Sequence, residues 1–127
     1  MHPLGIVAAI VAALIHVWFF VLESLWFARP TVWARFGLTS EEEARTVRSF
    51  AFNQGFYNLF LAVGVAIGVF LVATRDPVSG RAVILFACGS MVAAGAVLVL
   101  HNPAFLRAAL IQVVPAFVAM LAIWLSF

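Results

Sequence analysis

The chain has 127 residues, of which 66% are hydrophobic and 9% are charged, with a formal net charge of +2. Soluble domains carry roughly a quarter charged residues, and a small globule buries only about two-thirds of its unfolded surface, so this composition excludes a soluble globular domain. The positive charges are all arginines scattered at the ends of apolar runs, where they can reach lipid headgroups, so their pattern gives no indication of a nucleic-acid partner.

Four apolar segments are long enough to cross a bilayer, whose hydrocarbon core of about 30 Å needs roughly 20 helical residues. With their flanking turns, the helices are expected at about residues 4–28, 40–73, 82–100 and 104–127. In lipid, a helix satisfies its own backbone hydrogen bonds. The predicted fold is therefore all-α, an integral membrane four-helix transmembrane bundle. Residues 1–127 are expected to form one domain, with the lipid bilayer as its partner.

The first predicted helix carries two ionisable residues within its apolar run, His16 and Glu23. They are seven positions apart, which puts both on one face of an α-helix, and Trp26 continues that face. Ionisable groups at membrane depth are costly and mark a functional-site hypothesis. The helix is expected to end before Pro30, because the residue preceding a proline is pushed out of helical geometry.

The second predicted helix begins before the membrane, near Ser40, and enters the apolar layer around Phe50. A capping box can form between Ser40 and Glu43 or between Thr39 and Glu42. The run of acidic residues in this first turn also suits the positive end of the helix dipole. These residues are therefore interpreted as a solvated helix start rather than as a metal site.

Polar side chains also occur inside the second and fourth apolar runs. Asn53 and Tyr57 are four residues apart, as are Gln54 and Asn58, and Gln112 lies in the fourth run. At a rise of about 1.5 Å per residue, these groups and the first helix's carboxyl group lie at similar depths from one membrane side. The sequence therefore predicts a polar pocket between the first, second and fourth helices, opening toward the first and third loops.

The Glu23 carboxyl group must find a partner or lose its charge, since an unpaired charge in an apolar environment is costly. Candidate partners are His16, Arg48, Arg107 and the amide and phenol donors of the second helix. A neutral carboxylic acid hydrogen-bonded to an asparagine of that helix is an equal alternative. No metal site is predicted, because His16 and His101 lie at different depths, and no cofactor is indicated.

The remaining connections are predicted to be turns, one over residues 75–80 and another over residues 101–103. Gly64 and Gly68 form a small-xxx-small pair, which permits close approach of a second helix. That partner helix could belong to the same chain or to a second copy in a homodimer.

Four groups of residues form a recognisable pattern: Asn53-Gln54-Gly55-Phe56-Tyr57-Asn58 with Leu61-Ala62 and Gly64, His16 and Glu23 with Trp26, Phe36-Gly37-Leu38, and Gln112 with Pro115-Ala116. Together they resemble a family of small four-helix bacterial membrane proteins known as domain of unknown function 1304. The chain departs from the pattern at Ser24-Leu25, at Leu59 and at the end of the third helix, His101-Asn102-Pro103, which bears on the shape of the pocket. The resemblance implies the fold and the site positions, and it implies no activity.

Orientation follows from the arginines, since cytoplasmic loops carry an excess of positive residues. Loops one and three hold five of the arginines: Arg29, Arg35, Arg45, Arg48 and Arg107. The second loop holds only Arg75 and Arg81. The chain is therefore expected in the bacterial cytoplasmic membrane, with both termini outside.

Three functions are compatible with this pattern. The favoured hypothesis is binding or transport of a small molecule or ion, with a site formed by His16, Glu23, Trp26, Asn53, Gln54, Tyr57, Asn58 and Gln112. One alternative is a membrane-embedded enzyme that uses Glu23 and His16 for acid–base chemistry on a lipid-soluble substrate. The other is an accessory subunit, in which the polar residues only set the register of the helices.

Overall fold

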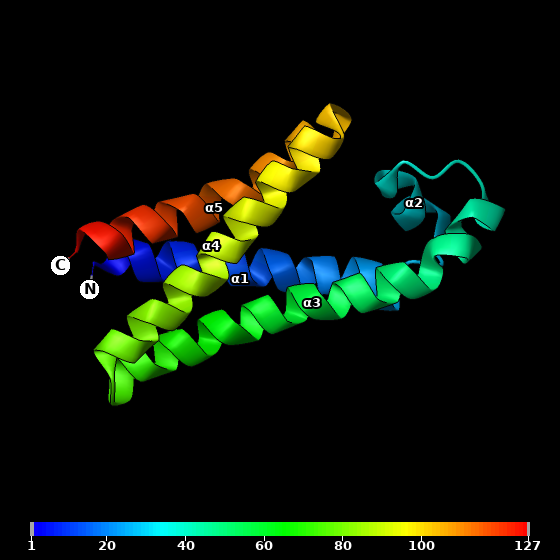
Figure 1. Ribbon diagram of the computed structural model, residues 1–127. Coiled ribbons are helices and arrows are strands. Elements are labelled where there is room, and N and C mark those ends of the chain that lie inside the picture. Colours follow the sequence, from blue (N-terminus) through cyan, green and yellow to red (C-terminus); the bar gives the residue numbers. More distant parts are fainter. Residues whose placement is uncertain (1, 127) are drawn as a thin grey trace. The chain divides into compact units, whose positions relative to one another are not determined.

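The computed structural model describes residues 2–126, and the helices follow one another with short connections (Figure 1). No strand occurs among these residues. The helical segments are α1 (Pro3–Phe20), η1 (Val21–Leu25), α2 (Pro30–Trp33), η2 (Ala34–Phe36), α3 (Glu41–Thr74), α4 (Pro77–His101), η3 (Pro103–Phe105) and α5 (Leu106–Leu125). The predicted all-α class is therefore confirmed.

Four helical stretches are long and apolar enough to cross a membrane. They are Pro3–Leu25, Glu41–Thr74, Pro77–His101 and Pro103–Leu125. This is the helix content expected of a multi-pass membrane protein, since each span needs roughly 20 apolar residues. The number of predicted spans agrees with these helices, whereas several of their ends differ from the predicted bounds.

The start of α3 is a capping box built on Ser40 and Glu43, the first of the two predicted pairs. The Ser40 Oγ accepts the backbone N–H of Glu43 at 3.2 Å. The Glu43 carboxylate reaches back to Thr39, accepting its hydroxyl at 2.8 Å and its backbone N–H at 3.3 Å. The reciprocal bond therefore goes one residue further back than in the standard capping box.

The start of α4 lies at Pro77, before the predicted start at residue 82. Asp76 is the N-cap, and its carboxylate accepts the backbone N–H of Ser79 at 3.0 Å. Pro77 occupies the first turn, where its missing N–H costs nothing. The predicted turn over residues 75–80 is thus wrong from Pro77 onward, because an Asp-Pro pair starts a helix as readily as it makes a turn.

The chain divides into two compact units. One unit comprises Met1–Ile15 with Leu61–Phe127, and the other comprises His16–Phe60. The boundaries fall inside α1 and α3 and not in linkers. The organisation of residues 1–127 as a single domain stays a prediction.

In the first unit, small and aliphatic side chains from four helices form the core. They are Ala8, Ala9 and Ala12 of α1, Val65 of α3, Ile84, Ala87, Cys88 and Met91 of α4, and Ala116, Ala119 and Ile123 of α5. The largest of these residues come from α4 and α5, while α1 contributes only alanines. Alanines leave little side chain between helix backbones, which permits close packing in an apolar environment.

Gly68 of α3 and Gly80 of α4 lie where these two helices approach closely. A Cβ at Gly80 would lie 2.6 Å from the Gly68 carbonyl oxygen, and one at Gly68 would lie 2.9 Å from the Gly80 carbonyl oxygen. A Cβ at Gly64 would lie 3.7 Å from the Ala87 Cβ of α4. The small-xxx-small pair therefore faces α4 of the same chain, and a homodimer through it stays a prediction.

The second unit holds the end of α1, η1, the short α2 and η2, and the beginning of α3. Its buried residues include Leu22, Phe27, Val32 and Ala44. Gly37 ends η2 with a φ of 82°, a left-handed conformation that glycine adopts without steric cost. This glycine lets the chain turn from η2 toward Leu38 and the start of α3.

Candidate functional site

The site begins with a change of helix type at the end of α1. From Val21 to Leu25 the chain forms a π-helix, in which the N–H of Trp26 donates to the carbonyl of Val21 at 2.9 Å. Single π-turns of this kind are rare and often occur at functional sites. The prediction that Glu23 shares the His16 face assumes regular α-helical spacing, and this spacing ends at Phe20.

Glu23 lies in the middle of the π-turn and is buried, with 9% of its surface exposed. Its Oε1 accepts a hydrogen bond from the Nδ2 of Asn58 on α3 at 2.9 Å, and Asn58 is 8% exposed. The structure thus selects one of the donors proposed from the sequence. Among residues 2–126, no hydrogen bond is made to the second carboxyl oxygen of Glu23, Oε2.

Ser24 and Gly55 bring the π-turn against α3. The Ser24 hydroxyl donates to the Phe52 carbonyl at 2.7 Å. A Cβ at Gly55 would overlap the Ser24 hydroxyl and would lie 3.1 Å from the Ser24 nitrogen. Only a glycine leaves room for this approach, which places Glu23 within hydrogen-bond distance of Asn58.

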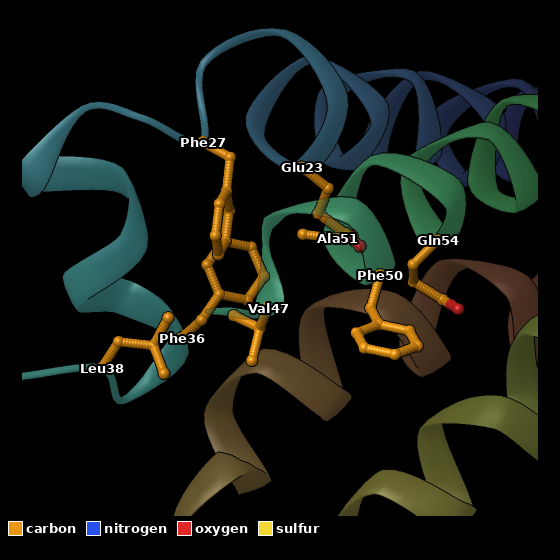
Figure 2. Close-up of a pocket in the computed structure, with 8 residues that line it drawn as sticks. All are labelled: Glu23, Phe27, Phe36, Leu38, Val47, Phe50, Ala51 and Gln54. Carbon is orange, nitrogen blue, oxygen red and sulfur yellow. The ribbon is translucent and has the colours of Figure 1, made fainter. Parts of the chain in front are cut away.

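A pocket of about 340 Å³ opens beside Glu23 within the second unit (Figure 2). Its lining residues are Glu23, Phe27, Phe36, Leu38, Val47, Phe50, Ala51 and Gln54. Phe27 and Phe36 pack against each other with ring centroids 5.6 Å apart. In the view of Figure 2, the Glu23 side chain lies to the right of this ring pair and ends above Phe50. Of the described residues that line the pocket, Glu23 is the only ionisable one.

Two predicted site residues of the first helix do not line this pocket. His16 is buried, and its ring contacts Phe19 edge to face at 5.3 Å. Trp26 packs edge to face against Trp18 at 5.5 Å and lies 4.3 Å from the Arg29 guanidinium carbon. Trp26 thus belongs to an aromatic and cationic cluster of the type found at membrane interfaces.

The predicted site residues of the second and fourth helices do not all lie at the pocket. Asn58 holds Glu23, and Gln54 lines the pocket although it is exposed. Asn53 and Tyr57 are exposed, Tyr57 to 56%, and they are not among the lining residues. Gln112 belongs to the other unit, where its Nε2 donates to the Met91 carbonyl at 2.9 Å. The structure therefore pairs Asn58 with Glu23 and puts Gln54 in the lining of the same pocket, and the three-helix site stays a prediction.

The apolar lining was not among the predicted site residues. Phe27, Phe36, Leu38, Val47 and Phe50 shape the pocket, yet a search for polar groups at membrane depth cannot find them. One signal was present in the sequence, since Phe36-Gly37-Leu38 is a segment that carries the family resemblance. Among residues 2–126, no group of three His, Cys, Asp or Glu side chains is placed to hold a metal ion.

Comparison with known proteins gives one match. A family model described as "Protein of unknown function (DUF1304)" matches residues 10–124. No curated protein and no solved structure matches the chain. The matched range contains every lining residue of the pocket as well as Asn58.

Proposed function

The protein belongs to the DUF1304 family, whose model covers most of its chain, and we propose that it is an integral membrane protein whose Glu23 pocket binds a small molecule. The supporting observation is the state of the Glu23 carboxyl group. One oxygen is held by Asn58, and the other has no hydrogen bond within residues 2–126. A carboxyl group with one held oxygen and one available oxygen, next to an apolar cavity, is typical of ligand sites. In such sites a few polar groups orient a largely apolar ligand.

The pocket lies near a membrane boundary. Glu23 is close to the end of the first span, Pro3–Leu25, and the other lining residues follow on η2, its flanking loop and the first part of α3. With the first loop in the cytoplasm, as the arginines indicate, a ligand enters from the cytoplasmic side. Transport would be a second step that requires access from the opposite side as well.

The enzyme alternative has less support than binding. Acid–base catalysis needs a proton-transferring group within reach of the substrate, and efficient sites usually combine an acid with a base. The pocket lining offers Glu23 alone, because His16 is not one of its residues. The accessory alternative explains the Glu23–Asn58 hydrogen bond as a contact that fixes the register of the two helices. It does not account for the adjoining cavity.

Native mass spectrometry of the protein in mild detergent tests the proposal. Wild type is expected to carry a bound small molecule, and Glu23→Gln is expected to lose most of it, because glutamine keeps the shape and removes the charge. The matched control is Glu41→Gln, the same chemical change at an exposed position in the first turn of α3. Identical spectra without ligand for wild type and Glu23→Gln would favour the accessory role instead.

A further inference from the structure

We infer that the ligand of the Glu23 pocket is an apolar organic cation, an ammonium group carried on a hydrophobic body. The inference rests on the proposed function and adds the chemical class of the ligand. It follows from three properties of the lining: its charge, its aromatic rings and its size.

The charge of the lining is one-sided. Among residues 2–126, Glu23 is the only ionisable residue of the lining, and no arginine or histidine of this part of the chain lines the pocket to neutralise an anionic ligand. Asn58 donates to Oε1, so the remaining oxygen is left to accept from, or pair with, a ligand. A carboxyl group in an apolar surround interacts strongly with a positive group, because the local dielectric is low. An anion would find no positive side chain in this lining, and it would be repelled by Glu23 whenever that carboxyl group is ionised.

The aromatic rings add a second preference for positive charge. Phe27, Phe36 and Phe50 line the same pocket as Glu23, and Phe27 is only 4% exposed. Phenylalanine offers no hydrogen bond, but the face of its ring attracts a cation through the ring quadrupole. An alkylated ammonium group donates few or no hydrogen bonds, so it relies on ring faces and a nearby negative charge.

The size and donor set of the pocket argue against a metal ion. A volume of about 340 Å³ falls in the range of small-molecule sites. Calcium takes roughly six to eight oxygen ligands, whereas the polar lining consists of one carboxyl group and one amide, Gln54. In the view of Figure 2, the Gln54 side chain points away from Glu23. The remaining wall is hydrocarbon and suits the apolar body of an organic molecule.

A pair of isosteric probes tests this inference. Benzyltrimethylammonium and neopentylbenzene have the same shape and differ only in the positive nitrogen. Affinities are measured by saturation-transfer NMR in a fixed detergent for wild type, Glu23→Gln and the control Glu41→Gln. Because both probes partition into micelles, the ratio of wild-type to variant affinity is compared for each probe. We expect a ratio of roughly tenfold for the cation and near one for its neutral isostere.

A second variant separates the rings from the carboxyl group. Phe36→Leu keeps an apolar side chain and removes one ring face, so we expect the cation to bind several-fold more weakly and the neutral isostere to bind as before. Circular dichroism and size-exclusion profiles matching wild type establish that the variant is folded. If Glu23→Gln does not fold, the Phe36→Leu comparison still decides the inference.

The outcomes distinguish the inference from the proposed function. If the ratio of wild-type to variant affinity is the same for the two probes, or if native mass spectra show a neutral co-purified ligand, the inference of a cationic ligand is refuted. The proposal that the pocket binds a small molecule would still stand. Failure of both probes together with empty wild-type spectra would refute both. A bound amine supports the inference, and its mass separates a free amine from a membrane lipid whose headgroup carries the ammonium.

Discussion

At the scale of single residues, the site depends on a hydrogen bond between a carboxyl group and an amide. A buried polar group without a partner costs free energy, so Glu23 requires a donor. The sequence left several donors open, and the structure selects Asn58, which is 35 positions away along the chain. Gly55 makes this pairing possible, because it lets Ser24 and the whole π-turn approach α3.

Replacing Gly55 by alanine tests the close approach. The added methyl group would overlap the Ser24 hydroxyl and crowd the backbone, so we expect Gly55→Ala to destabilise the fold by about 1–3 kcal/mol. The matched control is Gly89→Ala, where a Cβ would lie 3.7 Å from the Met120 Cε, an ordinary contact. Thermal unfolding in detergent compares the two, and equal melting temperatures would contradict the packing described for Ser24.

At the scale of elements, helix ends are the places where this chain departs from a simple pattern of spans. The π-turn at Val21–Leu25 changes the direction of Glu23 relative to regular α-helical spacing. Hydrophobicity cannot reveal such a turn, since Glu23 and Ser24 interrupt the apolar run there in the same way whether the helix is α or π. The Asp76 cap, by contrast, is visible as an Asp-Pro pair, and its geometry decides that α4 starts at Pro77.

The Asp76 cap makes part of the stability of α4 dependent on pH. Hydrogen bonds from the Ser79 hydroxyl and backbone lower the pKa of Asp76 below its ordinary value. A lowered folded-state pKa means that the stabilisation is present above the unfolded value and is lost as the pH falls through the folded value. We therefore expect wild type to lose thermal stability in acid at this cap.

Two variants isolate the charge of the cap. Asp76→Asn keeps a side-chain oxygen that can accept from the Ser79 N–H, so its melting temperature should vary less with pH in the acid range. Asp76→Ala removes the cap and should melt lower than wild type at neutral pH. Melting curves across the acid range, recorded in one detergent, provide the comparison. Parallel pH profiles for wild type and Asp76→Asn would show that the carboxylate does not contribute.

At the scale of the whole molecule, the distribution of arginines predicts an orientation. Four membrane crossings would put both termini on the same side of the membrane, and the positive loops one and three are expected in the cytoplasm. Under this orientation the Glu23 pocket lies on the cytoplasmic side of the first span.

Reporter fusions at the C-terminus test this orientation. We expect an alkaline phosphatase fusion to be active, because that enzyme matures outside the cytoplasm, and a green fluorescent protein fusion to be dark. Fusions in the first loop should give the reverse result and serve as the control. A fluorescent C-terminal fusion with inactive phosphatase would invert the topology and place the pocket on the opposite side.

The sequence by itself determined the all-α class and the number of membrane-length helices, and it singled out Glu23, Gln54 and Asn58 among the candidate site residues. These follow from properties of single residues and short runs, namely apolar length and the cost of polar groups in an apolar environment. The Asn-Gln-Gly-x-Tyr-Asn segment also identified the family, which the family model confirms over residues 10–124.

Only the tertiary structure decided which groups meet. It paired Glu23 with Asn58, left Asn53 and Tyr57 exposed, and lined a pocket with phenylalanines that no polarity pattern singles out. The physical reason is that contacts between distant segments depend on helix direction and separation. The π-turn changes the direction of the first helix, and Gly55 allows a smaller separation from α3. Neither effect can be recognised in the hydrophobicity pattern.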